Sequence, residues 1–273
     1  MSTEETIILK KQIKELLATN KRLNSKLEEA ETMKTHFISN VMNEIYNPFA
    51  SIISMAENIY TLSEGNLHKA NDMAKIIVDE AQKLDFHLKN LFAAARLEAG
   101  VEHVEYSKIN LNDIIPPILK TLENEIKIKD LEIVYQENFL TDNYFKTDRT
   151  KFILIMENLI NNALKFSKDG TKVEISLKRD NYGVKLDITN IPQENSDINL
   201  EEIFDRFKRG NSTINSVSGG NGLGLSIVKE YIDMINGSIS IFMDKSISIN
   251  IDIPDKLTDL EEDDDLISEA EFF

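Results

Sequence analysis

The first hundred residues have the hydrophobic periodicity of two long helices. Apolar residues recur every three or four positions over residues 6–63, a spacing that places them on one helical face. This pattern opens as a coiled-coil heptad, with Asn20 at a seam position where a polar residue commonly fixes the register. A second pattern covers residues 67–98 and is followed by Gly100, a typical C-terminal cap. Residues 63–66 have the composition of a turn, so the pattern predicts a helical hairpin.

A single hairpin of amphipathic helices leaves one apolar stripe uncovered. Pairing two hairpins into a four-helix bundle buries both stripes in one core. An interface of this kind joins two identical surfaces, which is the commonest symmetry of soluble oligomers. We therefore expect the chain to form a homodimer.

Beyond Gly100 the pattern changes to short runs of alternating apolar and polar residues. Two of these runs contain turn signals at 180–183 and near 244–245, which predict β-hairpins. The predicted strand regions are 101–109, 131–136, 171–190 and 237–254, and the predicted helices are 111–126, 148–166, 200–207 and 223–235. Strands interspersed with helices predict an α+β domain of two layers, a sheet covered by helices.

These patterns predict four parts in the 273-residue chain. Residues 1–34 form a coiled-coil helix, 35–100 the helical hairpin, 101–254 the α+β domain and 255–273 an acidic tail. The tail holds nine acidic residues and one lysine, a charge of -8 out of the total of -16. Such a run is typical of a solvated tail, although its Leu and Phe residues also fit a short docking segment.

Composition excludes several classes of function. The chain has no cysteine, so it forms no disulfide and uses no thiolate chemistry. Its four histidines are scattered without the spacing of metal ligands. No part is basic enough to indicate nucleic-acid binding, and no apolar run approaches the length that crosses a bilayer. We expect a cytoplasmic protein or the cytosolic part of a membrane receptor.

Two polar segments of the α+β region are candidates for a phosphate-binding site. In ENLINNALKFS, Asn158 and Asn162 are four residues apart and share a helical face, where both amide oxygens can reach one hard cation. Lys165 lies close to that face and can meet a phosphate. In SGGNGLGLSIVKEYI, a glycine-rich loop leads into a helix that starts near Leu223, an arrangement that presents N–H groups to an anion. Its spacing is neither the Rossmann nor the Walker pattern.

Three segments in this order carry a family resemblance: ENLINNALKFS, IFDRFKRG and GGNGLGLSIVK. They resemble the N, F and G2 boxes of sensor histidine kinases, whose ATP-binding fold is shared with gyrase B, MutL and the heat-shock protein 90 class. The resemblance covers residues 35–254. It implies that Asn158 and Asn162 bind Mg²⁺ and that Lys165 contacts a phosphate of ATP. It also implies a mobile lid over residues 208–221, and further nucleotide-binding residues Phe204, Phe207, Arg209, Gly220, Gly222, Leu223 and Gly224.

One box departs from the family pattern. The G1 loop, Asp-x-Gly-x-Gly, is expected after the strand that ends KLDITN, but the sequence there is NIPQEN. Asn190 replaces the adenine-binding Asp and can accept only a weaker, uncharged hydrogen bond. Ile191 and Pro192 do not permit the close backbone approach that glycine gives. We therefore expect weakened nucleotide binding.

The segment FISNVMNEIYNPF contains a proline inside the first helical pattern and resembles the H box of the same family, F-L-A-N-x-S-H-E-I-R-T/N-P-L. The phosphoacceptor histidine falls on Asn43, whose amide lone pair is delocalised and is not a nucleophile. Glu44 and Asn47 match the pattern. The resemblance implies that the acid assists phosphorylation and that Asn47 positions water against the aspartyl phosphate of a response regulator. Asn47 also fits a purely structural role, because the residue before a proline often relaxes a bend.

Three functions fit these residues. The first is a histidine-kinase-like protein that does not autophosphorylate, and acts on the receiver domain of a response regulator as a phosphatase or a docking platform. The second is a pseudokinase scaffold that forms heterodimers with another histidine kinase, which Tyr46 and the altered G1 loop favour. The third is an active kinase with an unusual acceptor. His36 lies one heptad before Asn43 but has neither the acid nor the proline in place to serve it.

Overall fold

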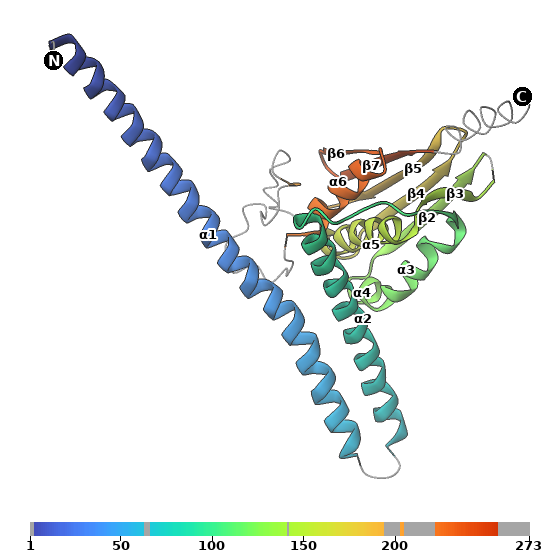
Figure 1. Ribbon diagram of the computed structural model, residues 1–273. Coiled ribbons are helices and arrows are strands. Elements are labelled where there is room, and N and C mark those ends of the chain that lie inside the picture. Colours follow the sequence, from blue (N-terminus) through green and yellow to red (C-terminus); the bar gives the residue numbers. More distant parts are fainter. Residues whose placement is uncertain (1–2, 63–65, 141, 194–202, 205–221, 256–273) are drawn as a thin grey trace, which may run out of the picture.

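The structure is a computed structural model that describes residues 3–62, 66–140, 142–193, 203–204 and 222–255 (Figure 1). Two long helices form an antiparallel hairpin, α1 (Thr3–Tyr60) and α2 (Leu67–Glu98). This confirms the predicted hairpin, and α2 has the predicted bounds. The first helix continues through Pro48, which is buried. None of the helices in these residues is both long and apolar enough to cross a membrane.

The end of α2 is fixed by a glycine in the left-handed region. Gly100 has a φ of +65°, which an L-residue adopts only with strain. The N–H of Val101 donates to the carbonyl of Arg96, and the N–H of Gly100 donates to that of Leu97. These two bonds define a Schellman motif and satisfy carbonyls at the helix end. The predicted C-terminal cap is therefore confirmed.

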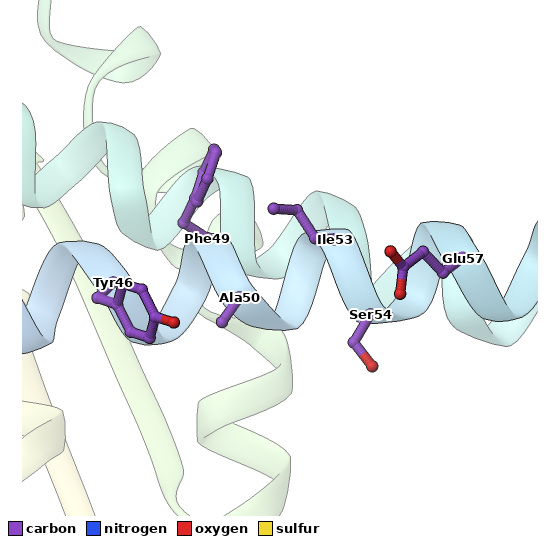
Figure 2. Close-up of a pocket in the computed structure, with 6 residues that line it drawn as sticks. All are labelled: Tyr46, Phe49, Ala50, Ile53, Ser54 and Glu57. Atoms are coloured by element: carbon purple, nitrogen blue, oxygen red, sulfur yellow. The ribbon is translucent and has the colours of Figure 1, made fainter.

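One face of α1 is apolar and exposed in the isolated chain. Figure 2 shows a shallow groove along this face, lined by Tyr46, Phe49, Ala50, Ile53, Ser54 and Glu57. The side chains of Tyr46 and Phe49 are 69% and 52% exposed. Seam residues nearer the N-terminus, including Ile13 and Leu23, are also exposed. This uncovered face fits the predicted four-helix bundle, and the homodimer stays a prediction.

The second half of the chain contains a five-stranded sheet with the order β2-β4-β5-β7-β6. Its strands are β2 (Glu132–Phe139), β4 (Lys172–Arg179), β5 (Gly183–Asn190), β6 (Ser238–Met243) and β7 (Ile247–Pro254). β2 runs parallel to β4, and the other neighbours are antiparallel. Both predicted hairpins, β4–β5 and β6–β7, are present. Asn190 ends the central strand β5, where it is paired with Val173 and Ile247.

Helices cover one face of this sheet. β4 alternates between buried residues such as Ile175 and exposed residues such as Glu174, as expected for a strand with one covered face. The covering helices are α5 (Arg149–Phe166) and α6 (Gly224–Met234), which pack against each other. Phe152, Ile155 and Leu159 of α5 are fully buried. This arrangement confirms the predicted two-layer α+β class and the two helices predicted for these regions.

Three details differ from the predicted elements. The continuous helix expected over 111–126 is a 3-10 turn followed by α3 (Ile115–Thr121) and α4 (Glu123–Ile128). Pro116 and Pro117 lack backbone N–H donors, so they are favoured in the first turn of a helix, and α3 begins at this point. The first strand, β1 (Tyr106–Asn110), starts later than predicted, and it pairs with an unpredicted strand, β3 (Tyr144–Asp148), in a separate small sheet. The helix predicted over 200–207 lies largely outside the described residues.

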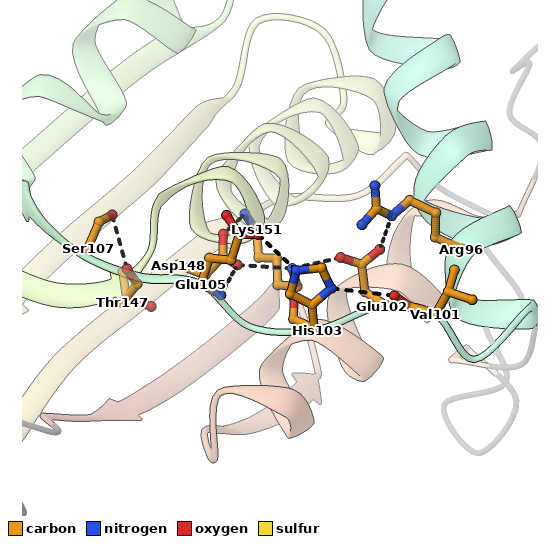
Figure 3. Close-up of polar contacts among 9 residues, drawn as sticks. All are labelled: Arg96, Val101, Glu102, His103, Glu105, Ser107, Thr147, Asp148 and Lys151. Atoms are coloured by element: carbon orange, nitrogen blue, oxygen red, sulfur yellow. Dashed lines mark hydrogen bonds and ion pairs between the residues drawn. The ribbon is translucent and has the colours of Figure 1, made fainter.

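A buried ionic network fixes the connection between α2 and the α+β region (Figure 3). Lys151 of α5 is 5% exposed, and its Nζ lies 2.7 Å from Glu102 and 3.0 Å from Asp148. The same ammonium donates to the carbonyl of His103 at 2.6 Å. Arg96, in the last turn of α2, contacts the other oxygen of Glu102 at 2.9 Å. The network therefore joins the end of α2 to the first turn of α5.

Candidate functional site

The candidate site lies where α5, α6 and the end of β5 meet. Helix α5 begins at Asp148, whose carboxylate accepts a hydrogen bond from the backbone N–H of Lys151 and so caps the helix. Ten residues on, Asn158 is buried, at 3% exposed, among apolar residues of the same helix. Asn162 follows one turn later and is partly exposed. The helix therefore carries the two amides on one face, as predicted.

Hydrogen bonds fix the direction of the Asn158 amide. Its Nδ2 donates to Oδ1 of Asn90 at 2.7 Å and to the carbonyl of Leu154 at 2.9 Å. A carbonyl only accepts, and Asn90 uses its own Nδ2 to donate to the carbonyl of Phe86. The nitrogen and oxygen of Asn158 are therefore assigned by chemistry. Because Nδ2 is used in these bonds, Oδ1 points away from them.

The oxygen of Asn158 faces the start of α6. A Cβ added to Gly224 would lie 2.5 Å from Asn158 Oδ1 and 3.7 Å from Asn162 Nδ2. Real Cβ atoms do not approach an oxygen this closely, so the position accepts only glycine without a shift. Gly222, two residues earlier, has a φ of +70°, also in the left-handed region. The structure therefore brings Asn158 and Asn162 of α5 next to Gly224 at the start of α6, although the two segments are some sixty residues apart in sequence.

These residues fit a nucleotide and a magnesium ion. Side-chain amide oxygens are hard ligands of the kind that Mg²⁺ accepts, and phosphate oxygens complete its coordination. The first turn of α6 has the positive end of its dipole and backbone N–H groups next to the same place. Within the described ranges, no group of three or more His, Asp or Glu is arranged to hold a metal. A cation here would therefore depend on amide and phosphate oxygens.

Asn190 provides a second test of this fit. It is 4% exposed, and its Nδ2 is buried without a hydrogen-bond partner in the described part of the chain. A buried donor without a partner costs free energy, and a purine ring offers the acceptor that it lacks. The residues after Asn190, where a glycine loop was expected, form backbone hydrogen bonds. The carbonyl of Ile191 accepts from the N–H of Lys168, and the N–H of Gln193 donates to the carbonyl of Phe166. This pairing ties the segment to the end of α5.

The other predicted nucleotide-binding residues are only partly described. Lys165 is partly buried, and its ammonium lies 5.2 Å from the ring centre of Phe166. Leu223 is fully buried before α6, and Phe204 lies in a turn and is partly buried. Phe207, Arg209 and Gly220 lie outside the described residues, together with the predicted lid over 208–221. The roles of all these residues remain predictions.

The H-box residues lie in the C-terminal half of α1. Asn43 and Asn47 are exposed, whereas Glu44 is largely buried. The carboxylate of Glu44 lies 3.3 Å from Nδ1 of His87 on α2. The structure therefore brings together the acid of the H box and a histidine that the sequence analysis did not select. Sequence alone gives no signal for this pairing, because the register of two antiparallel helices is not fixed by their apolar periodicity.

The sequence analysis also missed Asn90, which is 3% exposed. The sequence does contain a signal for Asn90. Helix α2 has a second apolar face, distinct from the face that packs on α1, which consists of Phe86, Ala93, Ala94 and Leu97. A helix with two apolar faces contacts two neighbours. Asn90 is the polar residue within this second face, and α5 is the neighbour that it meets.

Two further contacts join α2 to the α+β region. Lys89 of α2 lies 3.6 Å from Glu157 of α5, and Asn124 of α4 donates to Asp79 at 3.3 Å. Burial raises the pKa of Glu157, and this effect exceeds the lowering by the ammonium of Lys89. The fold and the site together define a nucleotide-binding α+β domain packed against a helical hairpin.

Comparisons with known proteins agree with this class. Residues 147–259 match the family described as "Histidine kinase-, DNA gyrase B-, and HSP90-like ATPase". Hybrid signal transduction histidine kinase D of Dictyostelium discoideum is 29% identical over 227 residues, which cover 80% of this chain and 14% of that protein. Histidine protein kinase SaeS of Staphylococcus aureus (strain MW2) is 29% identical over 224 residues, 81% of this chain and 63% of that protein.

A solved structure of similar fold is full-length ShkA in complex with AMPPNP. Its TM-score is 0.53 and its sequence identity is 15%, and the match covers 84% of this chain and 46% of the ShkA chain. Residues 147–259 thus match the histidine kinase-, gyrase B- and HSP90-like ATPase family, and about four fifths of the chain is similar to histidine kinases. The chain spans 63% or less of the length of both relatives named above.

Proposed function

We propose that this chain is a two-component signalling protein that binds Mg²⁺–ATP, accepts no phosphoryl group at position 43 and acts on the receiver domain of a response regulator. The observation that carries the nucleotide part is the meeting of Asn158 Oδ1 with the glycine at the start of α6, where a Cβ would lie only 2.5 Å away. It places the amide oxygen, a ligand for a cation, beside the backbone N–H groups at the start of α6, which can bind phosphate oxygens.

Different residues of the site would bind the metal ion, the phosphates and the adenine ring. Asn158 and Asn162 would hold Mg²⁺ through their amide oxygens, while the start of α6 and Lys165 would meet the phosphates. Asn190 would bind the adenine ring, because its buried Nδ2 has a hydrogen to donate. When bound, Mg²⁺ neutralises the charge between the β- and γ-phosphates. The chain's own residues orient the nucleotide and exclude water from it.

Position 43 cannot supply the nucleophile of a histidine kinase. The side chain of Asn43 is exposed on α1, but its nitrogen lone pair is delocalised into the amide carbonyl. Asn47, one turn later and also exposed, is accessible to a partner that docks on the hairpin. There it would orient water for attack on the aspartyl phosphate of a receiver domain, a reaction that needs no histidine.

The phosphatase part is tested with a receiver domain that carries an aspartyl phosphate. We expect the chain to accelerate loss of the phosphate, and Asn47→Ala to slow this reaction by about 10- to 100-fold, since misplaced water loses its alignment. Asn58→Ala, at another exposed position of α1, is the matched control and should leave the rate unchanged. Equal rates for the wild type and Asn47→Ala would contradict the proposed role of Asn47.

The nucleotide part is tested separately by calorimetry. Binding of ATP in the presence of Mg²⁺ is expected to be weaker than that of family members with the Asp-x-Gly-x-Gly loop, and Asn190→Ala should weaken it further, because the adenine ring loses the hydrogen bond from Nδ2. Absence of any binding heat would overturn this part. It would favour the second candidate function, a scaffold that forms heterodimers with a histidine kinase through the exposed face containing Tyr46 and Phe49.

A further inference from the structure

His87 occupies a position between the H-box acid and the nucleotide site. It lies on α2, and its Nδ1 is 3.3 Å from the carboxylate of Glu44 on α1. Asn90, which binds Asn158, is three residues further along α2, so His87 lies between the face that contacts α1 and the face that contacts α5. The side chain of His87 is 27% exposed, so it is held by its neighbours but remains accessible.

The charges around His87 favour a neutral imidazole. Burial lowers its pKa, and the positive charges of Lys165 and Lys83 lower it further. Lys165 is the lysine of the N box, so the same charge that would meet a phosphate of ATP also acts on His87. At pH 7 a neutral imidazole has a free lone pair on one of its two nitrogens.

We propose that His87 is the phosphoacceptor of this chain and that Glu44 is the group that takes its proton. This inference rests on the nucleotide binding proposed above. It assigns to α2 the nucleophile that position 43 of α1 lacks. Glu44 keeps the function that the H-box resemblance implies, because its carboxylate contacts the imidazole of His87 directly.

The proposed step is balanced in atoms and charge. With the proton on Nδ1, the nitrogen that lies 3.3 Å from the Glu44 carboxylate, the lone pair of Nε2 attacks the γ-phosphorus of ATP. A nitrogen–phosphorus bond forms while the bond from the γ-phosphorus to the bridging oxygen breaks, and that oxygen keeps the electron pair and leaves with ADP. The Nδ1 proton passes to the carboxylate of Glu44, so the products are phosphohistidine, ADP and a protonated glutamate.

The other described histidines lack this setting. His68 lies at the far end of α2 with a side chain that is 91% exposed, and it contacts Asp72. His103 lies in the connection after α2, is 62% exposed, and contacts Glu105. Neither is placed beside an H-box residue or a residue of the N box. They are therefore suitable control positions.

The experiment is incubation of the full chain with γ-labelled ATP and Mg²⁺, followed by mass spectrometry of the labelled peptides. We expect an acid-labile, base-stable label on the peptide that contains His87. His87→Gln should lose it, and His68→Gln should keep it. Glu44→Gln should slow labelling by about 100-fold, the contribution typical of a positioned proton acceptor.

Two measurements separate a chemical role from a structural one. Calorimetry should give a similar Mg²⁺–ATP affinity for the wild type and Glu44→Gln, because Glu44 contacts His87 and not the nucleotide. NMR of ¹⁵N-labelled histidine at pH 7 should show His87 as a neutral imidazole with its proton on Nδ1, and Glu44→Gln should change that signal but not the signal of His68.

The outcomes distinguish this inference from the proposed function. Bound ATP without label on His87, or label that maps to His36, would overturn the inference and leave nucleotide binding intact. Absence of ATP binding would overturn both. Label on His87 that persists unchanged in Glu44→Gln would overturn the role of Glu44.

Discussion

The amide of Asn158 donates a hydrogen bond of 2.7 Å to the side-chain oxygen of Asn90, which lies 68 residues earlier on a different helix. Both residues are almost fully buried. The bond fixes the Asn158 oxygen toward Gly224 and at the same time joins α5 to α2. A displacement of α2 would remove the acceptor and leave the buried amide free to change direction. The position of the hairpin and the binding of a cation by Asn158 are thereby coupled.

Replacing Asn90 should therefore affect both stability and nucleotide binding. Asn90→Ala leaves a buried N–H of Asn158 without its acceptor, which should lower the free energy of unfolding by about 1–3 kcal/mol. It should also weaken Mg²⁺–ATP binding measured by calorimetry, because the Asn158 oxygen is no longer held in place. Asn71→Ala, at an exposed position of the same helix, should change stability by less than about 0.5 kcal/mol. Unchanged nucleotide affinity in Asn90→Ala would show that Leu154 alone orients the amide.

A methyl group at position 224 should block the candidate site. In Gly224→Ala the new Cβ would lie 2.5 Å from Asn158 Oδ1, and two hydrogen bonds keep that amide from moving away. We expect a loss of about 1–3 kcal/mol in stability from overpacking, and loss of Mg²⁺–ATP binding. Gly170→Ala is the control: its φ of +71° also makes alanine costly, but no atom lies within 4 Å of the added methyl. If Gly170→Ala also lost nucleotide binding, the loss of binding in Gly224→Ala would be explained by lower stability and not by a blocked site.

Local sequence signals predicted most of the fold. The bounds of α2 follow from its periodicity and from Gly100, and α5 and α6 are long enough for their apolar faces to be unambiguous. β3 was missed because its five residues contain a single buried apolar side chain, Phe145, and too few alternations to distinguish a strand from a loop. The prediction of one helix over 111–126 did not take account of Pro116 and Pro117, which favour the start of a new helix at α3.

The candidate site was predictable only in part. Asn158, Asn162 and the glycines before α6 were found because each has a local pattern, and the fold brings them together. Asn90 and His87 were missed for a physical reason: each is a single polar residue on a helix, and its partner is set by the packing of α2 between α1 and α5. Long-range packing of this kind leaves no signature in spacing along one chain.

Introducing a histidine at position 43 tests whether the Asn43 side chain is the only obstacle to phosphorylation at this position. In the His87→Gln background, Asn43→His supplies a ring nitrogen next to Glu44, and we expect acid-labile label from γ-labelled ATP to appear at residue 43. The label should be mapped by mass spectrometry. The control is Asn58→His, at an exposed position further along α1, which should remain unlabelled. Equal labelling at both positions would indicate non-specific chemistry.

The ammonium of Lys151 is expected to be important for stability. Lys151→Met leaves the buried carboxylate of Asp148 without its cation and that of Glu102 with Arg96 alone, which should lower the free energy of unfolding by about 3–5 kcal/mol. Urea unfolding gives this value directly. Lys178→Met removes an exposed lysine that contacts Asp187 at 3.0 Å, and the change there should be below about 1 kcal/mol. Similar losses in the two variants would show that the network does not act as a buried unit.

The same network predicts a pH dependence with a defined sign. Burial raises the pKa of Glu102, but the hydrogen bond and charge of Lys151 and the charge of Arg96 outweigh it, and the net pKa lies below its ordinary value of 4.5. A carboxyl group whose pKa is lowered by folding stabilises the protein above its unfolded pKa, and this stabilisation is lost as the pH falls through the folded pKa. The difference in unfolding free energy between the wild type and Glu102→Gln should therefore be largest above about pH 5 and shrink below pH 4.5. A Glu102→Gln difference that stays constant down to pH 3 would mean that hydrogen bonding and not charge holds the network together.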